Sequence, residues 1–89
     1  MTILVDPPAW PGHGRLWSHL ASDESFEELH AFAARLGLPA RGFDGDHYDL
    51  MESDYQRAID AGAAPISSRE LVTRLTRAGL RRRKQRRRP

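Results

Sequence analysis

The sequence predicts a small α/β domain in which short strands and three helices follow in the order strand, strand, helix, strand, helix, strand, helix. Two observations lead to this prediction: short apolar runs end in Asp, Ser or Pro, and three longer stretches repeat their apolar residues at helical spacing. We expect a mixed or mostly parallel sheet, because strands and helices alternate in the later part of the chain. The 89 residues suffice for one domain, which we place over residues 1–80, followed by a basic tail over residues 81–89.

Two strands open the domain. Residues 2–6, TILVD, form an apolar run that is followed by Pro-Pro, which is typical of a buried strand. Residues 7–14 hold three Pro and two Gly and are expected to form a loop. Residues 15–21, RLWSHLA, alternate as a second strand does, with a short helix as the alternative. Two further short strands are expected over residues 47–50 and around Ile66.

Three helices are predicted from one signature, a Ser followed three residues later by Glu or Gln, which together cap the first turn of a helix. The first helix spans about residues 26–36, the second runs from near Ser53 to Gly62, and the third follows Ser67 and ends at Gly79. The capping pairs are Ser25 with Glu28, Ser53 with Gln56, and Ser67 with Glu70.

The net charge of +2 hides two regions of opposite sign. Residues 1–80 contain seven Arg and twelve acidic side chains, a net −5, whereas residues 81–88 contain seven Arg or Lys and no acid. A body of that sign repels phosphate backbones, so we expect any nucleic-acid binding to depend on the tail. The lack of cysteine excludes disulfides and thiolate metal sites. Because there is no signal-peptide pattern and no run of 18 apolar residues, we expect a cytoplasmic protein that does not enter a membrane.

Histidine and aspartate gather at predicted strand ends, where α/β proteins bind ligands. His47 and Asp49 lie two residues apart on one predicted strand and so share a face, while His19 and Asp6 come from the first two strands. His19, His47, Asp49 and Asp6 are suitable ligands for a divalent metal such as zinc, manganese or iron. As catalytic residues, His47 or His19 would serve as acid or base and Asp49 would orient it. The alternative is that these histidines only pack and form hydrogen bonds, since no local motif such as HExxH joins them.

A phosphate site is predicted at the start of the third helix. Ser67, Ser68 and Arg69 offer hydroxyls, free backbone N–H groups and a cation, and Arg15 and Arg41 add charge from neighbouring loops. The alternative is that Ser67 only caps the helix, because a capping box uses the same N–H donors. No Gly-rich phosphate loop of the Walker or dinucleotide type is present.

The basic tail is expected to be disordered, since its charges repel one another and it has no apolar surface to bury. Arginine forks suit phosphates and guanine edges, which makes nucleic acid a candidate partner. The alternatives are that the tail docks on the acidic body or only aids solubility. Trp10 and Trp17 similarly either stack on a base or sugar or pack within the domain. The cations of the tail are Arg81, Arg82, Arg83, Lys84, Arg86, Arg87 and Arg88.

Four stretches of the chain resemble, in order and spacing, a bacterial and phage family called domain of unknown function (DUF) 4031. They are VDPPAWPGHGRLWSHLASD, ELHAFAARLGLP, FDGDHYDL and AGAAPISSRELVTRL. The resemblance covers about residues 3–80 and leaves out the basic tail. It implies no established activity, so the site residues depend on the reasoning given above.

Two functions compete at this point. The first is a small cytoplasmic domain whose His/Asp pocket binds a metal ion or a phosphorylated small ligand, with hydrolysis as a further step. The second is an accessory module that holds nucleic acid through its tail. A third, simpler hypothesis is a partner-binding module in which the polar cluster only satisfies hydrogen bonds. Whether the protein is an enzyme stays open.

Overall fold

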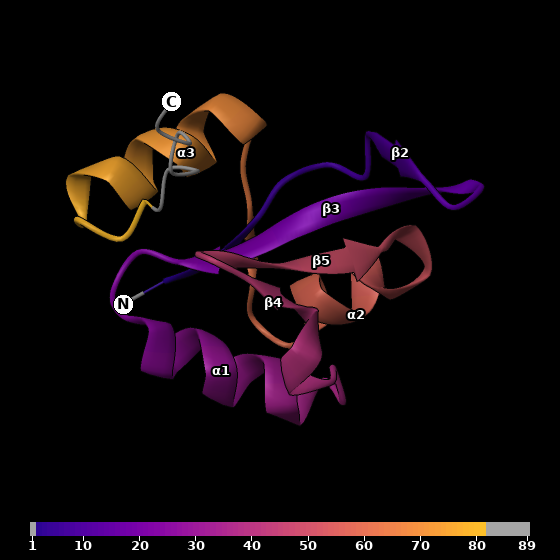
Figure 1. The fold of residues 1–89 in the computed structure, drawn as a ribbon, viewed down its shortest axis with the longest axis horizontal. Coiled ribbons are helices and arrows are strands. Elements are labelled where there is room, and N and C mark those ends of the chain that lie inside the picture. Colours follow the sequence, from indigo (N-terminus) through magenta and orange to yellow (C-terminus); the bar gives the residue numbers. More distant parts are fainter. Residues whose placement is uncertain (1, 82–89) are drawn as a thin grey trace, which may run out of the picture.

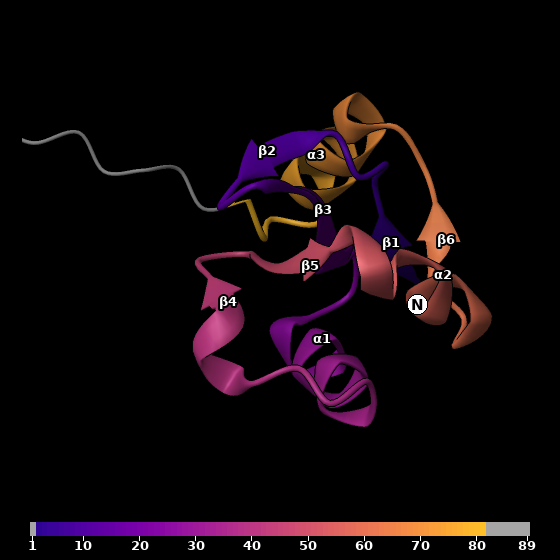
Figure 2. The ribbon, with the colours of Figure 1, turned by 90° about the vertical axis from the view of Figure 1, so that its right-hand side faces the viewer.

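Six strands and three α-helices make up the described part of the chain, residues 2–81, in a computed structural model (Figure 1). Helices α1 and α2 cover one face of the sheet, and α3 lies on the other (Figure 2). The predicted α/β fold with three helices is confirmed. In chain order the elements are β1 (Ile3–Val5), β2 (Trp10–Gly12), β3 (Arg15–Ser22), α1 (Phe26–Arg35), β4 (Phe43–Asp44), β5 (His47–Met51), α2 (Tyr55–Asp60), β6 (Ala64–Pro65) and α3 (Ser68–Arg77), with short 3₁₀ turns at Ala40–Gly42 and Glu52–Asp54.

The sheet is mixed, which is one of the two predicted arrangements. Its strand order is β4-β5-β3-β1-β6, with β2 paired to the first residues of β3. Within residues 2–81 only β1 and β6 pair in parallel, and β5 departs from the parallel pattern expected of the later chain because it runs antiparallel to β3. The reason is the β4–β5 hairpin that follows α1: its second strand pairs with β3, after the turn has reversed the chain.

Two short strands were not predicted. β2 lies within the segment 7–14 that was expected to be a loop, and it forms a hairpin with β3 in which Trp10 faces Trp17. The turn uses His13 and Gly14, both with positive φ (52° and 75°), as a tight two-residue hairpin turn requires. β4 lies in the stretch that was predicted to be a turn before the strand at residues 47–50. Proline in β2 and the two-residue length of β4 explain why neither shows a strand pattern.

The predicted helix caps are correct for two of the three helices. The hydroxyls of Ser25 and Ser67 accept hydrogen bonds from backbone N–H groups three residues later, at 3.0 Å each. The prediction that Ser53 caps the second helix is wrong, because the chain leaves β5 through the 3₁₀ turn Glu52–Asp54. Gln56 instead donates to Asp60 within α2, at 3.0 Å.

The two faces of the sheet carry apolar cores of different size. On the α1/α2 face the strand residues Val5, Leu20 and Leu50 are fully buried beneath Leu29 and its neighbours on α1. On the α3 face the core is small and consists of Leu4, Ala21, Leu71 and Leu75. Because side chains alternate along a strand, the residues that continue this second face beyond the small core are polar, and they form the site described below. No helix within residues 2–81 is long and apolar enough to cross a membrane.

Candidate metal centre

The candidate site lies where three neighbouring strands carry polar residues on the α3 face of the sheet. His19 of β3 is paired in register with Asp49 of β5, and Asp6, directly after β1, donates its backbone N–H to the His19 carbonyl at 3.2 Å. His47 lies two residues before Asp49, so its side chain shares that face. Ligand atoms of His19, His47 and Asp49 lie within 4.8 Å of one another. Three of the four predicted metal ligands therefore come together.

Asp6 lies behind His19 and contacts it as a hydrogen-bond partner. Its carboxylate is 2.8 Å from His19 Nδ1 and 2.6 Å from the His19 backbone N–H, which donates to it. It also accepts from Ser68 Oγ at 2.8 Å and from Trp10 Nε1 at 3.3 Å. With four donors around a fully buried carboxylate, Asp6 is placed to orient His19 and not to coordinate an ion itself.

His47 is held in the same way by a residue that sequence reasoning missed. His47 Nδ1 lies 2.7 Å from Asp46 Oδ1, and Asp46 is buried. His47 Nε2 lies 3.2 Å from Asp49 Oδ1. The second oxygen of Asp46 is 3.4 Å from Arg81 Nη1, so this carboxylate links the histidine to the first residue of the predicted tail.

The two histidines therefore share one arrangement. Each has its Nδ1 against a buried carboxylate, and an ionised carboxylate accepts a hydrogen bond from the tautomer that carries Nδ1–H. The rings of His19 and His47 stand edge to face with centroids 4.8 Å apart. The second ring nitrogen of His47, Nε2, lies 3.2 Å from the exposed carboxylate of Asp49. A carboxylate behind each coordinating histidine is the usual second layer of protein metal sites.

Asp6 and His19 shift each other's pKa values in opposite directions. The hydrogen bond to Asp6 raises the pKa of His19 above its usual value, against the effect of burial. Burial alone would raise the pKa of Asp6, but the hydrogen bonds from His19 and Ser68 outweigh it, so the pKa of Asp6 lies below its usual value. The pair thus favours an ionised Asp6, which is the form that accepts a hydrogen bond from Nδ1–H.

A cleft of about 480 Å³ opens between this group and α3, and we call it the α3 cleft. It runs from Ser68 and Arg69 at the start of α3 to Arg81 beyond its end, with the two histidines along one side. Its volume is in the range of small-ligand sites. It is lined by Asp6, Trp10, His19, Asp46, His47, Ser68, Arg69, Leu71, Val72, Leu75 and Arg81.

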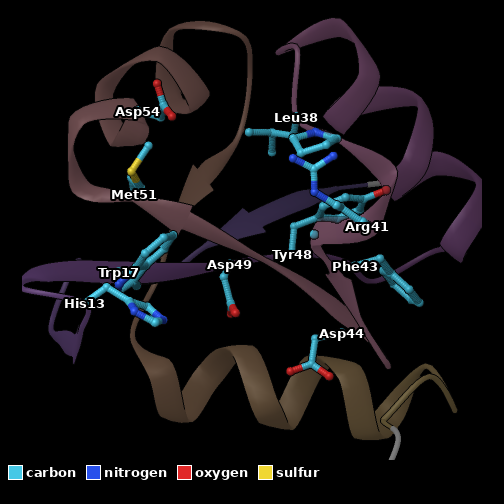
Figure 3. A pocket seen from close by; sticks show the side chains of 12 residues that line it. His13, Trp17, Leu38, Arg41, Phe43, Asp44, Tyr48, Asp49, Met51 and Asp54 are labelled. Atoms are coloured by element: carbon cyan, nitrogen blue, oxygen red, sulfur yellow. The ribbon is translucent and has the colours of Figure 1, made fainter.

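A larger cavity of about 760 Å³ lies on the other side of Asp49 (Figure 3). In this view Asp49 stands between Trp17 and His13 of the β2–β3 hairpin and the side chains of Phe43 and Tyr48. Asp49 lines this cavity, while His19 and His47 line the α3 cleft, so the group borders both. The remaining lining residues are Leu38, Pro39, Arg41, Gly42, Asp44, Met51 and Asp54.

The residues predicted to bind phosphate are divided between different places. Ser68 and Arg69 line the α3 cleft, and the hydroxyl of Ser68 donates to Asp6. Ser67 caps α3. Arg15 lies at the far end of β3, with Nη1 2.8 Å from Met51 Sδ, and does not line the α3 cleft.

The other two histidines make different contacts. His30 Nδ1 is 2.7 Å from the Tyr48 hydroxyl, and His13 lies in the hairpin turn with its ring 6.5 Å from that of Trp17. Of the predicted tail, Arg81 lines the α3 cleft. The remaining cations lie outside the described residues: Arg82, Arg83, Lys84, Arg86, Arg87 and Arg88.

A comparison with family models agrees with the resemblance found in the sequence. The family described as "Protein of unknown function (DUF4031)" matches residues 3–78, nearly all of the described chain and the whole of the candidate metal group. No curated protein and no solved structure matches the chain.

Proposed function

The chain belongs to the DUF4031 family, and we propose that this member binds a divalent transition-metal ion and hydrolyses a phosphorylated ligand there. The ion would be held by Nε2 of His19, Nε2 of His47 and a carboxylate oxygen of Asp49. Two imidazoles and one carboxylate form a donor set that suits zinc, manganese or iron(II) and leaves further positions for water or substrate.

The observation that carries the proposal is the buried carboxylate behind each histidine. Asp6 and Asp46 are 0 % and 2 % exposed, and a buried carboxylate is costly unless it is paired. Both lie against Nδ1 of a histidine, and with Nδ1 protonated the Nε2 atom of each ring would supply a lone pair to an ion held with Asp49. Histidines that only fill space would not need this repeated arrangement.

The α3 cleft supports the hydrolytic part of the proposal. A metal ion bound at such a group lowers the pKa of its water and makes it a nucleophile near neutral pH. Arg69 and Ser68 line the same cleft, so a phosphoryl group placed against the site would meet a guanidinium and a hydroxyl. Asp6 and Asp46 keep the histidine rings in place while the substrate binds.

Metal analysis of the purified protein tests the proposal. After dialysis against Zn²⁺ or Mn²⁺ and then against metal-free buffer, the protein should retain about one ion per chain, as expected for a three-ligand site. Asp49→Asn should weaken binding by about tenfold or more, because it removes a charged ligand. Asp49 has an exposed side chain, so the variant is expected to fold.

His30→Ala is the matched control, because it removes a histidine of α1 that contacts Tyr48 and not the metal group. It should bind metal as the unmodified protein does. Retention of no metal, or the same loss in His30→Ala as in Asp49→Asn, would contradict the proposal.

A further inference from the structure

The α3 cleft presents an unused cation next to the proposed metal centre. Arg69 lines the cleft and makes no ion pair with any residue between 2 and 81. Its neighbour Ser68 contacts Asp6, which places this end of the cleft beside His19. An anion in the cleft would therefore meet Arg69 while it lies against the metal group.

The opposite end of the cleft is where the positive charge of the chain joins its acidic body. Arg81 lines the cleft and contacts Asp46, the partner of His47. Six further cations follow within residues 82–88, whereas residues 1–80 carry a net −5. Most of the body repels a polyanion, whereas this end attracts it. Electrostatic attraction would therefore bring a polyanion close to His19, His47 and Asp49. A single small phosphate would not need so many cations.

Aromatic rings lie on both sides of the metal group. Trp10 is 45 % exposed and lines the α3 cleft, with its ring centroid 5.1 Å from that of His19. Trp17 lines the larger cavity beyond Asp49, facing Phe43 and Tyr48 across it (Figure 3). Exposed rings beside a cationic groove are how proteins hold unpaired bases, which stack on them, while Arg and Lys follow the phosphates.

We propose that the substrate of this centre is the phosphodiester backbone of single-stranded nucleic acid, and this inference rests on the proposed metal-dependent hydrolysis. One phosphodiester group faces His19, His47 and Asp49, neighbouring phosphates meet Arg69 and Arg81, and an adjacent base stacks on Trp10 or Trp17. Water adds to phosphorus, one P–O ester bond breaks, and the departing sugar oxygen takes the proton that the water loses. The products are one phosphate end and one hydroxyl end.

Labelled oligothymidine DNA and oligouridine RNA test the inference with the full chain. Binding is followed by fluorescence anisotropy without metal, and cleavage is followed by gel electrophoresis with Mn²⁺. The triple variant Arg82→Gln, Arg83→Gln, Lys84→Gln should bind more weakly. The slope of log affinity against log salt concentration should become less steep by about two, because each phosphate contact on a single strand contributes about 0.7 to that slope. Arg69→Gln should make the same slope less steep by about 0.7.

Two controls separate charge from chemistry. Arg35→Gln removes a cation of α1, on the opposite face of the sheet, and should leave the salt dependence unchanged. Asp49→Asn should abolish cleavage of whichever oligonucleotide is cut, while metal-free binding persists. The tail and Arg69 variants should retain the metal content of the unmodified protein.

The outcomes distinguish the two proposals. Metal-loaded protein that hydrolyses bis(p-nitrophenyl) phosphate but neither binds nor cleaves an oligonucleotide overturns the inference and leaves the proposed function standing. The inference is also overturned if the triple variant binds with the same salt dependence as the unmodified protein and cleaves as well. Protein that binds oligonucleotides but retains no metal overturns the proposed function, and the cleavage with it.

Discussion

At the scale of single residues, a buried carboxylate lies against Nδ1 of His19 and another against Nδ1 of His47. His19, His47 and Asp49 could be identified from the sequence, because residue type and alternation along a strand suggest a common face. Asp6 was also identified, but as a ligand, and its four hydrogen-bond donors give it a supporting position. Asp46 was missed because a neighbour of His47 in a regular strand would point to the opposite face; it lies in the hairpin turn instead.

Asp6→Asn tests this supporting role. The amide keeps the size of the side chain but removes the charge that raises the pKa of His19, so in the metal-free protein that pKa should fall toward its ordinary value. Metal affinity should fall by about 10- to 100-fold, as for other changes behind a coordinating histidine. Proton NMR titration of the imidazole and a metal competition assay measure the two effects. Asp60→Asn, on α2, should change neither; an unchanged His19 titration in Asp6→Asn would contradict the assigned contact.

At the scale of elements, the helices were easier to predict than the strands. The caps Ser25 and Ser67 could be predicted because each hydroxyl accepts from a backbone N–H only three residues later in the chain. The strands β2 and β4 depend on partners elsewhere in the chain, and β5 pairs antiparallel with β3 because of a hairpin whose first strand has only two residues. Local pattern carries little information about such pairings.

One ion pair between elements gives the fold a defined response to acid. Arg74 of α3 lies 2.7 Å from Asp23, which follows β3 and also accepts from the Thr2 backbone N–H. Burial acts to raise the pKa of Asp23, but Arg74 and Thr2 outweigh it and lower the pKa below its ordinary value of 3.8. The ionised form is therefore favoured in the folded chain, so its stabilising effect is complete above the ordinary pKa and is lost as pH falls through the lowered one.

Asp23→Asn should therefore lower the free energy of unfolding by about 1 kcal/mol at neutral pH, the usual size of a partly exposed ion pair. The difference from the unmodified protein should shrink on acidification below the ordinary Asp pKa. Urea unfolding followed by circular dichroism, once at neutral pH and once below the ordinary Asp pKa, measures the two differences in free energy. A difference that grows in acid would contradict the assignment.

At the scale of the whole molecule, the two faces of the sheet carry different kinds of residue. Its α1/α2 face carries the larger core, and its α3 face combines a four-residue core with the His/Asp group and the α3 cleft. The sequence predicted the α/β class and the grouping of polar residues, because both follow from local periodicity and strand ends. It did not predict that Arg81 lies against Asp46, since contacts across 35 residues depend on where α3 packs.

Nitrogen-15 NMR of the histidine rings during a zinc titration tests the metal centre most directly, because it reports each ring nitrogen separately. The Nε2 signals of His19 and His47 should shift on binding, while their Nδ1 atoms stay protonated against Asp6 and Asp46. The rings of His13 and His30 should not respond. Zinc that leaves His19 and His47 unchanged, or that binds through Nδ1, would contradict the account.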